Sequence, residues 1–134
     1  MIFDSQGDLK EVIHVIKRSS EIPEEVLPEF KGGEGHISIF QFMSEEESNG
    51  MGRLFAKSVI PPGNSIGKHT HEGDQETYYI LKGKALLTLN GEETVLEPGD
   101  CTMCFDGNTH SIKSIGDVDL EYIAIILYTK QKEV

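Results

Sequence analysis

The distribution of hydrophobic and polar positions along this chain predicts many short β-strands separated by turns. From residue 36 onward, short apolar and β-branched runs end at glycine, proline, asparagine or acidic clusters. Such a pattern is typical of an all-β sandwich or barrel. The expected strands are 37–43, 53–60, a short strand carrying His69 and His71, 76–81, 84–89, 92–96, 100–105, 110–115 and 120–128.

One turn between these strands is specified with particular clarity. Asn90-Gly91 separates two apolar runs by two residues. A type I′ turn needs positive φ at both central positions, and asparagine followed by glycine meets that need best. We therefore expect a tight hairpin between strands 84–89 and 92–96.

The first 36 residues differ from the rest. The run Val12–Lys17 indicates a strand, and the segment Ser20–Leu27 predicts a single helical turn with Ser20 as its possible cap. Gly33-Glu34-Gly35 follows in a flexible loop, and it lacks the third glycine and the helix of a dinucleotide-binding fingerprint. We expect three parts: an N-terminal extension over 1–35, a barrel over 36–128 and a C-terminal tail over 129–134.

Length and charge narrow the class of protein. With 134 residues, 37% of them hydrophobic, the chain can form one domain with a buried core. Its 12 basic and 23 acidic residues give a net charge of −11, which repels nucleic acid and anionic membranes. An anionic substrate is not excluded, because a bound cation can reverse the field inside a pocket.

The sequence predicts a cytoplasmic protein. Its longest apolar run, 122–128, has the length of a strand and falls short of the ~20 residues that a spanning helix needs. The first residues lack a basic region followed by an apolar one, so they do not form a secretory signal.

The two cysteines, Cys101 and Cys104, form a CxxC within an expected strand. Positions i and i+3 of a strand face opposite sides, so a disulfide or a shared metal would require the strand to break. We expect structural, mostly buried thiols here rather than redox or zinc chemistry.

Three histidines and one glutamate form the candidate metal site. His69 and His71 are two residues apart and project to the same face of a strand. A glycine-aspartate turn then lets the chain reverse, so that Glu76 opens a probable neighbouring strand, and His110 begins a later one. Imidazole and carboxylate ligands suit Zn, Fe, Ni, Mn or Cu better than Ca or Mg. The expected cofactor is one divalent ion of Fe, Mn, Ni or Zn.

Other polar residues are weaker candidates. Tyr78 shares the strand face of Glu76 and is a candidate acid or hydrogen-bond donor, with barrel packing as the alternative. Arg53 and Lys57 share a strand face and are candidates for binding a carboxylate or phosphate, with a solvated outer face as the alternative. His14 and His36 lack neighbouring ligand residues and are interpreted as ordinary strand or loop histidines.

Two segments resemble the conserved motifs of the cupin superfamily. The segment Gly63-x5-His69-x-His71-x4-Glu76-x6-Gly83 is similar to the first cupin motif at each of its fixed positions. The segment Gly99-x5-Phe105-x-Gly107-x2-His110-x3-Ser114 resembles the second motif. There the family usually has proline in place of Phe105 and asparagine in place of Ser114, neither of which is a metal ligand.

The resemblance implies a double-stranded β-helix, in which two antiparallel sheets close as a jelly-roll barrel. It implies that His69, His71, Glu76 and His110 hold one divalent metal in the barrel mouth. It also implies a homodimer in which N-terminal strands cross to the partner, and Val12–Lys17 is available for that role.

Because cupins share a site and differ in chemistry, the resemblance leaves three functions open. The first is a metal-dependent enzyme of the oxygenase, lyase or isomerase type that acts on a small polar molecule such as a sugar or organic acid. The second is a non-catalytic module that binds or senses a small molecule. The third is a barrel whose site is vestigial or purely structural.

Overall fold

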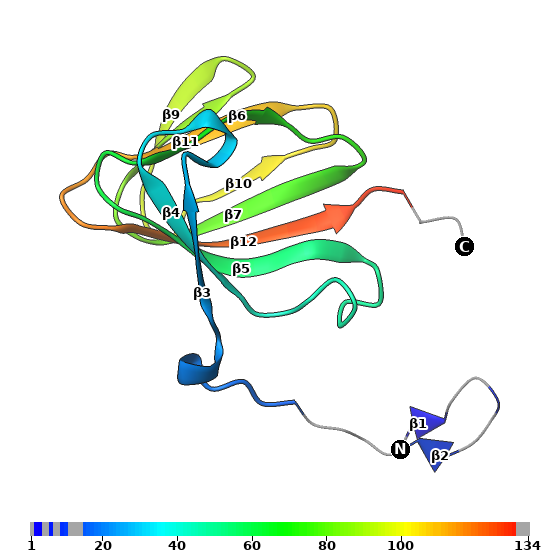
Figure 1. Cartoon of the computed structure of the whole chain (residues 1–134). Helices are drawn as coiled ribbons and strands as arrows, with labels where there is room; N and C mark the ends of the chain where they lie inside the picture. The colour runs from blue at the N-terminus through cyan, green and yellow to red at the C-terminus, as the bar shows by residue number, and fades with distance from the viewer. Residues whose placement is uncertain (1, 4–5, 7–8, 11–14, 131–134) are drawn as a thin grey trace.

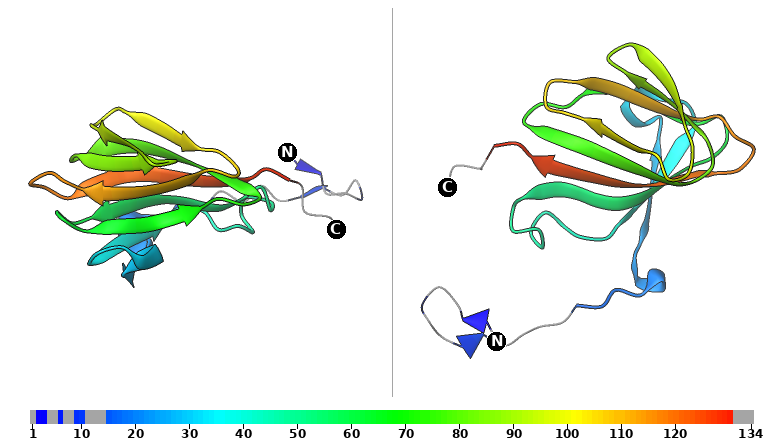
Figure 2. Two further views of the ribbon diagram at one scale, coloured as in Figure 1. Left: turned by 90° about the horizontal axis from the view of Figure 1, so that it is seen from above. Right: turned by 180° about the vertical axis from the view of Figure 1, so that it is seen from behind.

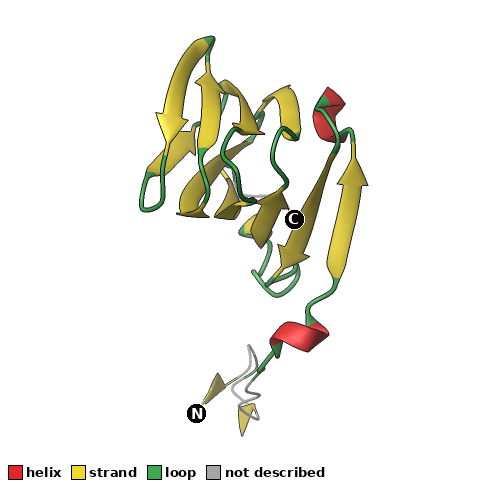
Figure 3. Ribbon diagram, turned by 90° about the vertical axis from the view of Figure 1, so that its left-hand side faces the viewer, coloured by secondary structure: helices red, strands yellow, loops and turns green. Residues whose placement is uncertain are grey.

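The structure, a computed structural model, describes residues 2–3, 6, 9–10 and 15–130. Almost all of its regular structure is β-strand, with two single turns of 3₁₀ helix, η1 (Ser19–Glu21) and η2 (Phe30–Gly32) (Figure 3). The strands are β1 (Ile2–Phe3), β2 (Leu9–Lys10), β3 (Glu24–Pro28), β4 (His36–Gln41), β5 (Gly52–Ile60), β6 (Ser65–Thr70), β7 (Asp74–Lys82), β8 (Ala85–Leu89), β9 (Glu92–Leu96), β10 (Cys101–Cys104), β11 (Thr109–Ser114) and β12 (Leu120–Tyr128).

Two antiparallel sheets form the barrel (Figure 1). One has six strands in the order β10-β7-β12-β5-β4-β3, and the other has four in the order β6-β11-β8-β9. The predicted all-β jelly-roll fold is therefore confirmed. Nine strands lie close to the positions expected from residue 36 onward.

Strand alternation builds the core between the sheets. In β12, Leu120, Tyr122, Ala124 and Ile126 are buried in turn, while the residues between them are partly exposed. The inward faces of the other long strands join them in one apolar cluster. Because side chains two apart share a face, the same period that forms this core also determines which polar residues enter the barrel.

The Asn90-Gly91 hairpin is confirmed. Both residues have positive φ, 50° for Asn90 and 83° for Gly91. Leu89 lies opposite Glu92 in the β8–β9 ladder, so the two residues form the complete turn.

The N-terminal predictions are partly wrong. Residues 12–14 lie outside the described part of the chain, and 15–17 carry no strand. The expected helical turn is shorter, because η1 ends at Glu21 and no side chain caps it. Strand β3 occupies part of the segment that was expected to be helical, and it pairs with β4 at the edge of the larger sheet. Beyond it, the chain leads away from the barrel toward its N-terminus (Figure 2, right).

Both cysteines are free and lie at the two ends of β10. Cys104 is buried, whereas Cys101 is exposed, so the expectation of opposite faces is confirmed and that of two buried thiols is not. Burial raises the pKa of the Cys104 thiol to about 11, which keeps it protonated at neutral pH. Within the described residues, no helix has the length and apolar character needed to cross a membrane.

Gly83 generates the first prediction. It has a φ of 84°, and a Cβ there would lie 2.6 Å from the carbonyl oxygen of Asp119. Gly91 has the same positive φ, yet no heavy atom lies within 4 Å of the position of its Cβ. We expect Gly91→Ala to lower the free energy of unfolding by about 1–2 kcal/mol through backbone strain alone. Gly83→Ala should cost at least about 1 kcal/mol more, because backbone must also move. Urea denaturation of both variants measures this difference, and equal losses would contradict it.

Candidate metal centre

The four predicted ligands come together at one point between the two sheets. His69 lies on β6 and His110 on β11, where they are direct cross-strand partners in the smaller sheet. Glu76 lies on β7 in the larger sheet. The expectation that Glu76 lies on a strand neighbouring that of the histidines is wrong, because β6 and β7 belong to different sheets. The cluster thus connects the two sheets.

The loop before β11 fixes the fourth residue of the cluster, His71, which follows the end of β6. Its backbone N–H donates to the carbonyl of Asn108 at 3.0 Å, and its own carbonyl accepts from Gly107 at 2.7 Å. Both backbone polar groups of His71 are thus satisfied, as buried backbone groups normally are, although the residue lies outside the strand.

The ligand atoms converge closely. Glu76 Oε1 lies 3.1 Å from His110 Nε2, 3.2 Å from His71 Nε2 and 4.0 Å from His69 Nε2. His110 Nε2 is 3.0 Å from the Nε2 atom of each of the other two histidines. All four atoms lie within 4.8 Å of one another.

These separations fit a bound transition metal. Metal–nitrogen bonds of about 2.1 Å place adjacent ligand atoms about 3 Å apart. The Nδ1 of His69 lies 2.8 Å from the Gly67 carbonyl oxygen, which can only accept, so Nδ1 carries the proton and Nε2 presents its lone pair. His71 Nδ1 lies 2.8 Å from the carboxylate of Asp74, with the same consequence. The nitrogen that faces the cluster in both rings is therefore Nε2, which a cation would bind in place of a proton, and a hydrogen bond to the other ring nitrogen is what orients a metal-binding histidine.

The site is deeply buried and strongly coupled electrostatically. Glu76 is 6% exposed, and His71 and His110 are each 2% exposed. Burial opposes ionisation of Glu76, but hydrogen bonding to the three imidazoles outweighs it and holds the carboxyl pKa well below its usual range. Hydrogen bonding to Glu76 raises the pKa of His71 against the opposing effect of burial, whereas burial lowers the pKa of His110.

Asp74 orients the imidazole of His71 through a hydrogen bond to the ring nitrogen that faces away from the cluster. Its Oδ1 accepts from His71 Nδ1, and its Oδ2 accepts from Arg53 Nε at 2.8 Å. Sequence analysis interpreted Asp74 only as a turn residue. Its position two residues before Glu76 was the available signal, because it places Asp74 on the same inward face of β7.

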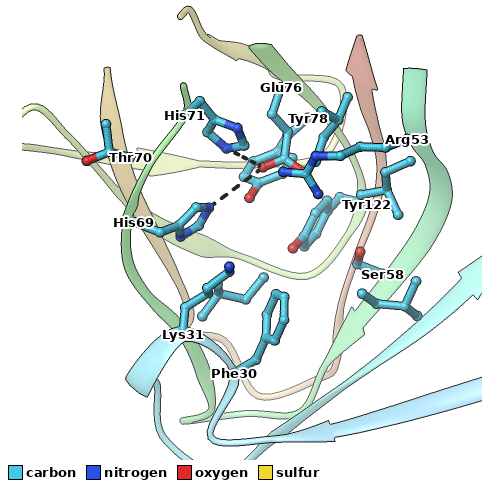
Figure 4. A pocket seen from close by; sticks show the side chains of 14 residues that line it. Phe30, Lys31, Arg53, Ser58, His69, Thr70, His71, Glu76, Tyr78 and Tyr122 are labelled. Carbon is cyan, nitrogen blue, oxygen red and sulfur yellow. Dashed lines mark hydrogen bonds and ion pairs between the residues drawn. The ribbon is translucent and has the colours of Figure 1, made fainter. Parts of the chain in front are cut away.

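A cavity opens onto the cluster from the side of β6 and η2 (Figure 4). Its apolar walls come from both sheets, and its polar lining includes hydroxyl groups and two cations. The lining residues besides His69, His71 and Glu76 are Phe30, Lys31, Ile39, Arg53, Leu54, Ser58, Ile66, Thr70, Tyr78, Tyr122 and Ile126.

Tyr78 lies in this cavity, as its alternation with Glu76 predicted. Its ring stacks on His110 at 5.1 Å between centroids and lies 4.6 Å from Tyr122. Burial, reinforced by the negative charge of Glu76, raises the pKa of Tyr78 well above its usual value. Burial likewise raises the pKa of Tyr122. Both phenols are therefore protonated at neutral pH and able to donate hydrogen bonds.

Of the two basic residues proposed from the sequence, Arg53 lines the cavity and Lys57 does not. Arg53 lines the cavity from the start of β5, although its guanidinium is already paired with Asp74. Lys57 lies outside the cavity lining, 3.8 Å from Glu121 and over the ring of Phe40. Lys31, which sequence analysis did not single out, lines the cavity instead. It comes from a turn distant in sequence, and no local pattern marked it.

Comparison with known proteins identifies the family. A family model described as the cupin domain matches residues 56–126, which is more than half of the chain. The chain belongs to the cupin family. That range includes all four residues of the cluster, so the resemblance seen in the two motifs is confirmed for the family.

A curated protein and a solved structure, both from Thermotoga maritima, match most of this cupin. The chain is 39% identical over 119 residues to an oxalate-binding protein, which covers 89% of this chain and 98% of the relative. It is also similar to a crystal structure described as a predicted oxalate decarboxylase, with 38% identity and a TM-score of 0.82 over 85% of this chain and 99% of that one.

Two further matches have lower sequence identity. Quercetin 2,3-dioxygenase from Bacillus subtilis is 26% identical over 100 residues, which are 70% of this chain and 30% of that protein. The structure of KdgF from a Halomonas species has 16% identity and a TM-score of 0.66, over 89% of this chain and 97% of that one, so it supports the fold alone.

The contact between Asp74 and His71 generates the second prediction. Asp74→Asn removes the charge that orients the imidazole, and loss of such a partner typically weakens metal affinity by about 10- to 100-fold. Glu72→Gln is the matched control, because Glu72 is exposed and adjacent to His71 in the chain. Competition with a chelator, with Mn²⁺ or Zn²⁺ as the ion, measures both affinities. Equal affinities in the two variants would exclude the supporting role of Asp74.

Proposed function

We propose that this cupin holds one divalent transition metal through His69, His71, Glu76 and His110 and uses it to bind a small organic acid. The observation that carries the proposal is a cavity lined by three of the four residues whose possible ligand atoms converge. Four protein ligands on an octahedral ion leave two positions for water or a ligand, and an open position distinguishes a working site from a structural one.

The complete ligand set argues against a vestigial site. Three imidazoles and a carboxylate suit Fe, Mn, Ni or Zn, and the buried carboxylate of Glu76 requires positive charge nearby. When bound, such an ion supplies a Lewis acid for a carboxylate oxygen. The chain itself supplies the orientation of the imidazoles, through Asp74 and the Gly67 carbonyl.

Two lines of support favour an organic acid over a sugar. A relative that matches almost the whole chain is named as an oxalate-binding protein. The cavity lining also includes Lys31, which provides positive potential in a protein of net charge −11, whereas the charge of Arg53 is paired with Asp74. Apolar walls of Phe30, Ile39 and Leu54 offer few partners to a molecule with many hydroxyl groups.

An enzyme that turns over the same acid is the second candidate. The hydroxyl groups of Tyr78 and Tyr122 favour it, because both line the cavity and remain protonated. Glu76 is the one carboxylate among the described lining residues, and it belongs to the proposed ligand set. A reaction of the lyase type, in which Tyr78 donates a proton, fits these residues better than one that needs a free carboxylate as base.

Three further expectations stay predictions. They are a homodimer, a cytoplasmic location, and the division of the chain into an extension over 1–35, a barrel over 36–128 and a tail over 129–134. Strand β3 belongs to the same sheet as the barrel strands, so the part of the extension that contains it packs as part of the barrel.

Metal content is the third prediction. After reconstitution with Fe, Mn, Ni or Zn salts, we expect about one equivalent of metal per chain by elemental analysis. The double variant His69→Ala/His71→Ala should hold none, because it lacks two of the four ligands. His36→Ala is the control, since His36 is exposed and lies outside the cluster, and it should retain the full equivalent. Reconstituted wild-type protein without metal would contradict the proposal.

Binding of oxalate is the fourth prediction. Oxalate at about 100 times its Kd should stabilise the metal-loaded protein by about 2.7 kcal/mol, seen as a higher melting temperature. Protein stripped with a chelator should show no such shift, and metal analysis after the melt checks that oxalate has not removed the ion. Absence of stabilisation while the metal stays bound would refute the proposed ligand class. Loss of oxalate from the same mixtures, reduced in Tyr78→Phe, would favour the enzyme.

A further inference from the structure

The mouth of the cavity is bordered by the turn η2, whose backbone is unusual. Lys31 lies in the middle of this turn with φ 56° and ψ 29°, and Glu29 before it has a φ of 46°. Both are left-handed conformations in residues other than glycine, which cost free energy and persist only where the surroundings enforce them.

The surroundings that enforce this turn belong to β6, the strand that carries His69. A Cβ at Gly67 would lie 2.0 Å from the Lys31 carbonyl oxygen, and a Cβ at Gly33 would lie 2.1 Å from the Ser65 carbonyl oxygen. Because these two residues are glycines, the backbones of η2 and β6 can pack directly against each other. Hydrogen bonds between Glu34 and Ser65, at 2.9 Å in each direction, fasten the same pair of segments.

The consequence of this packing is the position of one side chain. Lys31 lines the cavity together with His69, and Figure 4 shows its ammonium between His69 and Phe30. Its Nζ lies 5.5 Å from the centroid of the Phe30 ring. Among the described residues, no carboxylate lies within 4.0 Å of this ammonium, whereas Arg53 is paired with Asp74. Lys31 is therefore the cavity cation whose charge is available to a ligand.

Charge balance indicates the kind of ligand that this arrangement fits. Arg53 and Asp74 neutralise each other, and Glu76 neutralises one charge of a divalent ion. One positive charge of the ion remains, and together with the charge of Lys31 it gives the site two positive charges. A ligand with two negative charges neutralises the site, while one with a single charge leaves a positive charge uncompensated in a partly buried cavity, which is costly.

We propose that Lys31 selects a dianionic ligand at the metal centre, such as a small dicarboxylate, by pairing its ammonium with the carboxylate oxygens that face the cavity mouth. This role rests on the proposed function. Lys31 acts here as a specificity residue, held in place by the close packing of η2 on β6.

The experiment compares two ligands of nearly the same shape and different charge, oxalate with two negative charges and oxamate with one. Their Kd values are measured by calorimetry on metal-loaded wild-type protein and on Lys31→Met, Lys31→Arg and Lys68→Met. Lys68→Met is the matched control, because it removes the same charge from an exposed position of β6 outside the cavity lining. Metal content and melting temperature verify that each variant remains folded and loaded.

We expect Lys31→Met to weaken oxalate binding by about 10- to 100-fold, because it removes a hydrogen-bonded charge pair. In the same Lys31→Met variant, oxamate binding should weaken by about threefold or less. Lys31→Arg should retain most of the preference for oxalate over oxamate. Lys68→Met should behave as wild type.

The outcomes separate the two proposals. Wild-type protein that retains metal but binds neither anion would overturn the proposed function together with the role of Lys31. Wild-type protein that binds oxalate, with Lys31→Met equal to Lys68→Met, would overturn the role of Lys31 alone. Equal losses for oxalate and oxamate in Lys31→Met would show a general effect of charge and likewise overturn the selection of a dianion.

Discussion

The buried carboxylate of Glu76 is the constraint on which the site depends. A carboxylate that is only 6% exposed must be compensated, and three imidazoles supply its nearest partners. Two of these imidazoles come from β6 and its C-terminal end and one from β11, while Glu76 comes from the opposite sheet. Compensation of this charge therefore requires the two sheets to close on each other at one point.

Strand alternation makes this closure compatible with an apolar core. On β7 the buried face carries Asp74, Glu76, Tyr78 and Ile80 in succession, from the mouth of the barrel to its interior. The polar end forms part of the histidine–glutamate cluster and supports it, Tyr78 stacks on His110 beneath it, and Ile80 belongs to the apolar cluster. One face of β7 thus carries polar residues of the cluster at one end and apolar core residues at the other, and its two-residue period is unbroken.

Much of this organisation follows from local sequence. The strands from residue 36 onward and the Asn90-Gly91 hairpin depend on period-two patterning and turn chemistry, and both are confirmed. The four residues of the cluster were selected by spacing and residue type, and the structure brings them together. The expectation that Glu76 lies on a strand neighbouring that of the histidines was wrong, since β6 and β7 belong to different sheets. A glycine turn between two strands looks the same in sequence whether it joins them in a hairpin or passes between sheets. Strand β3 was missed because its residues, two glutamates and a proline among five, suit an exposed edge and lack a strong strand pattern.

Residues that depend on long-range packing are the ones that sequence could not place. Lys31 reaches the cavity only because Gly33 and Gly67 allow η2 to pack against β6, at a distance of more than thirty residues in the chain. A strongly acidic protein can therefore present a local positive rim to an anion, since the net charge of −11 is distributed elsewhere on its surface. Cupins with the same metal ligands can differ in this rim, because the turn that forms it lies outside both ligand motifs. The proposed selection of a ligand in this chain thus depends on a segment that lies apart in sequence from the proposed metal ligands.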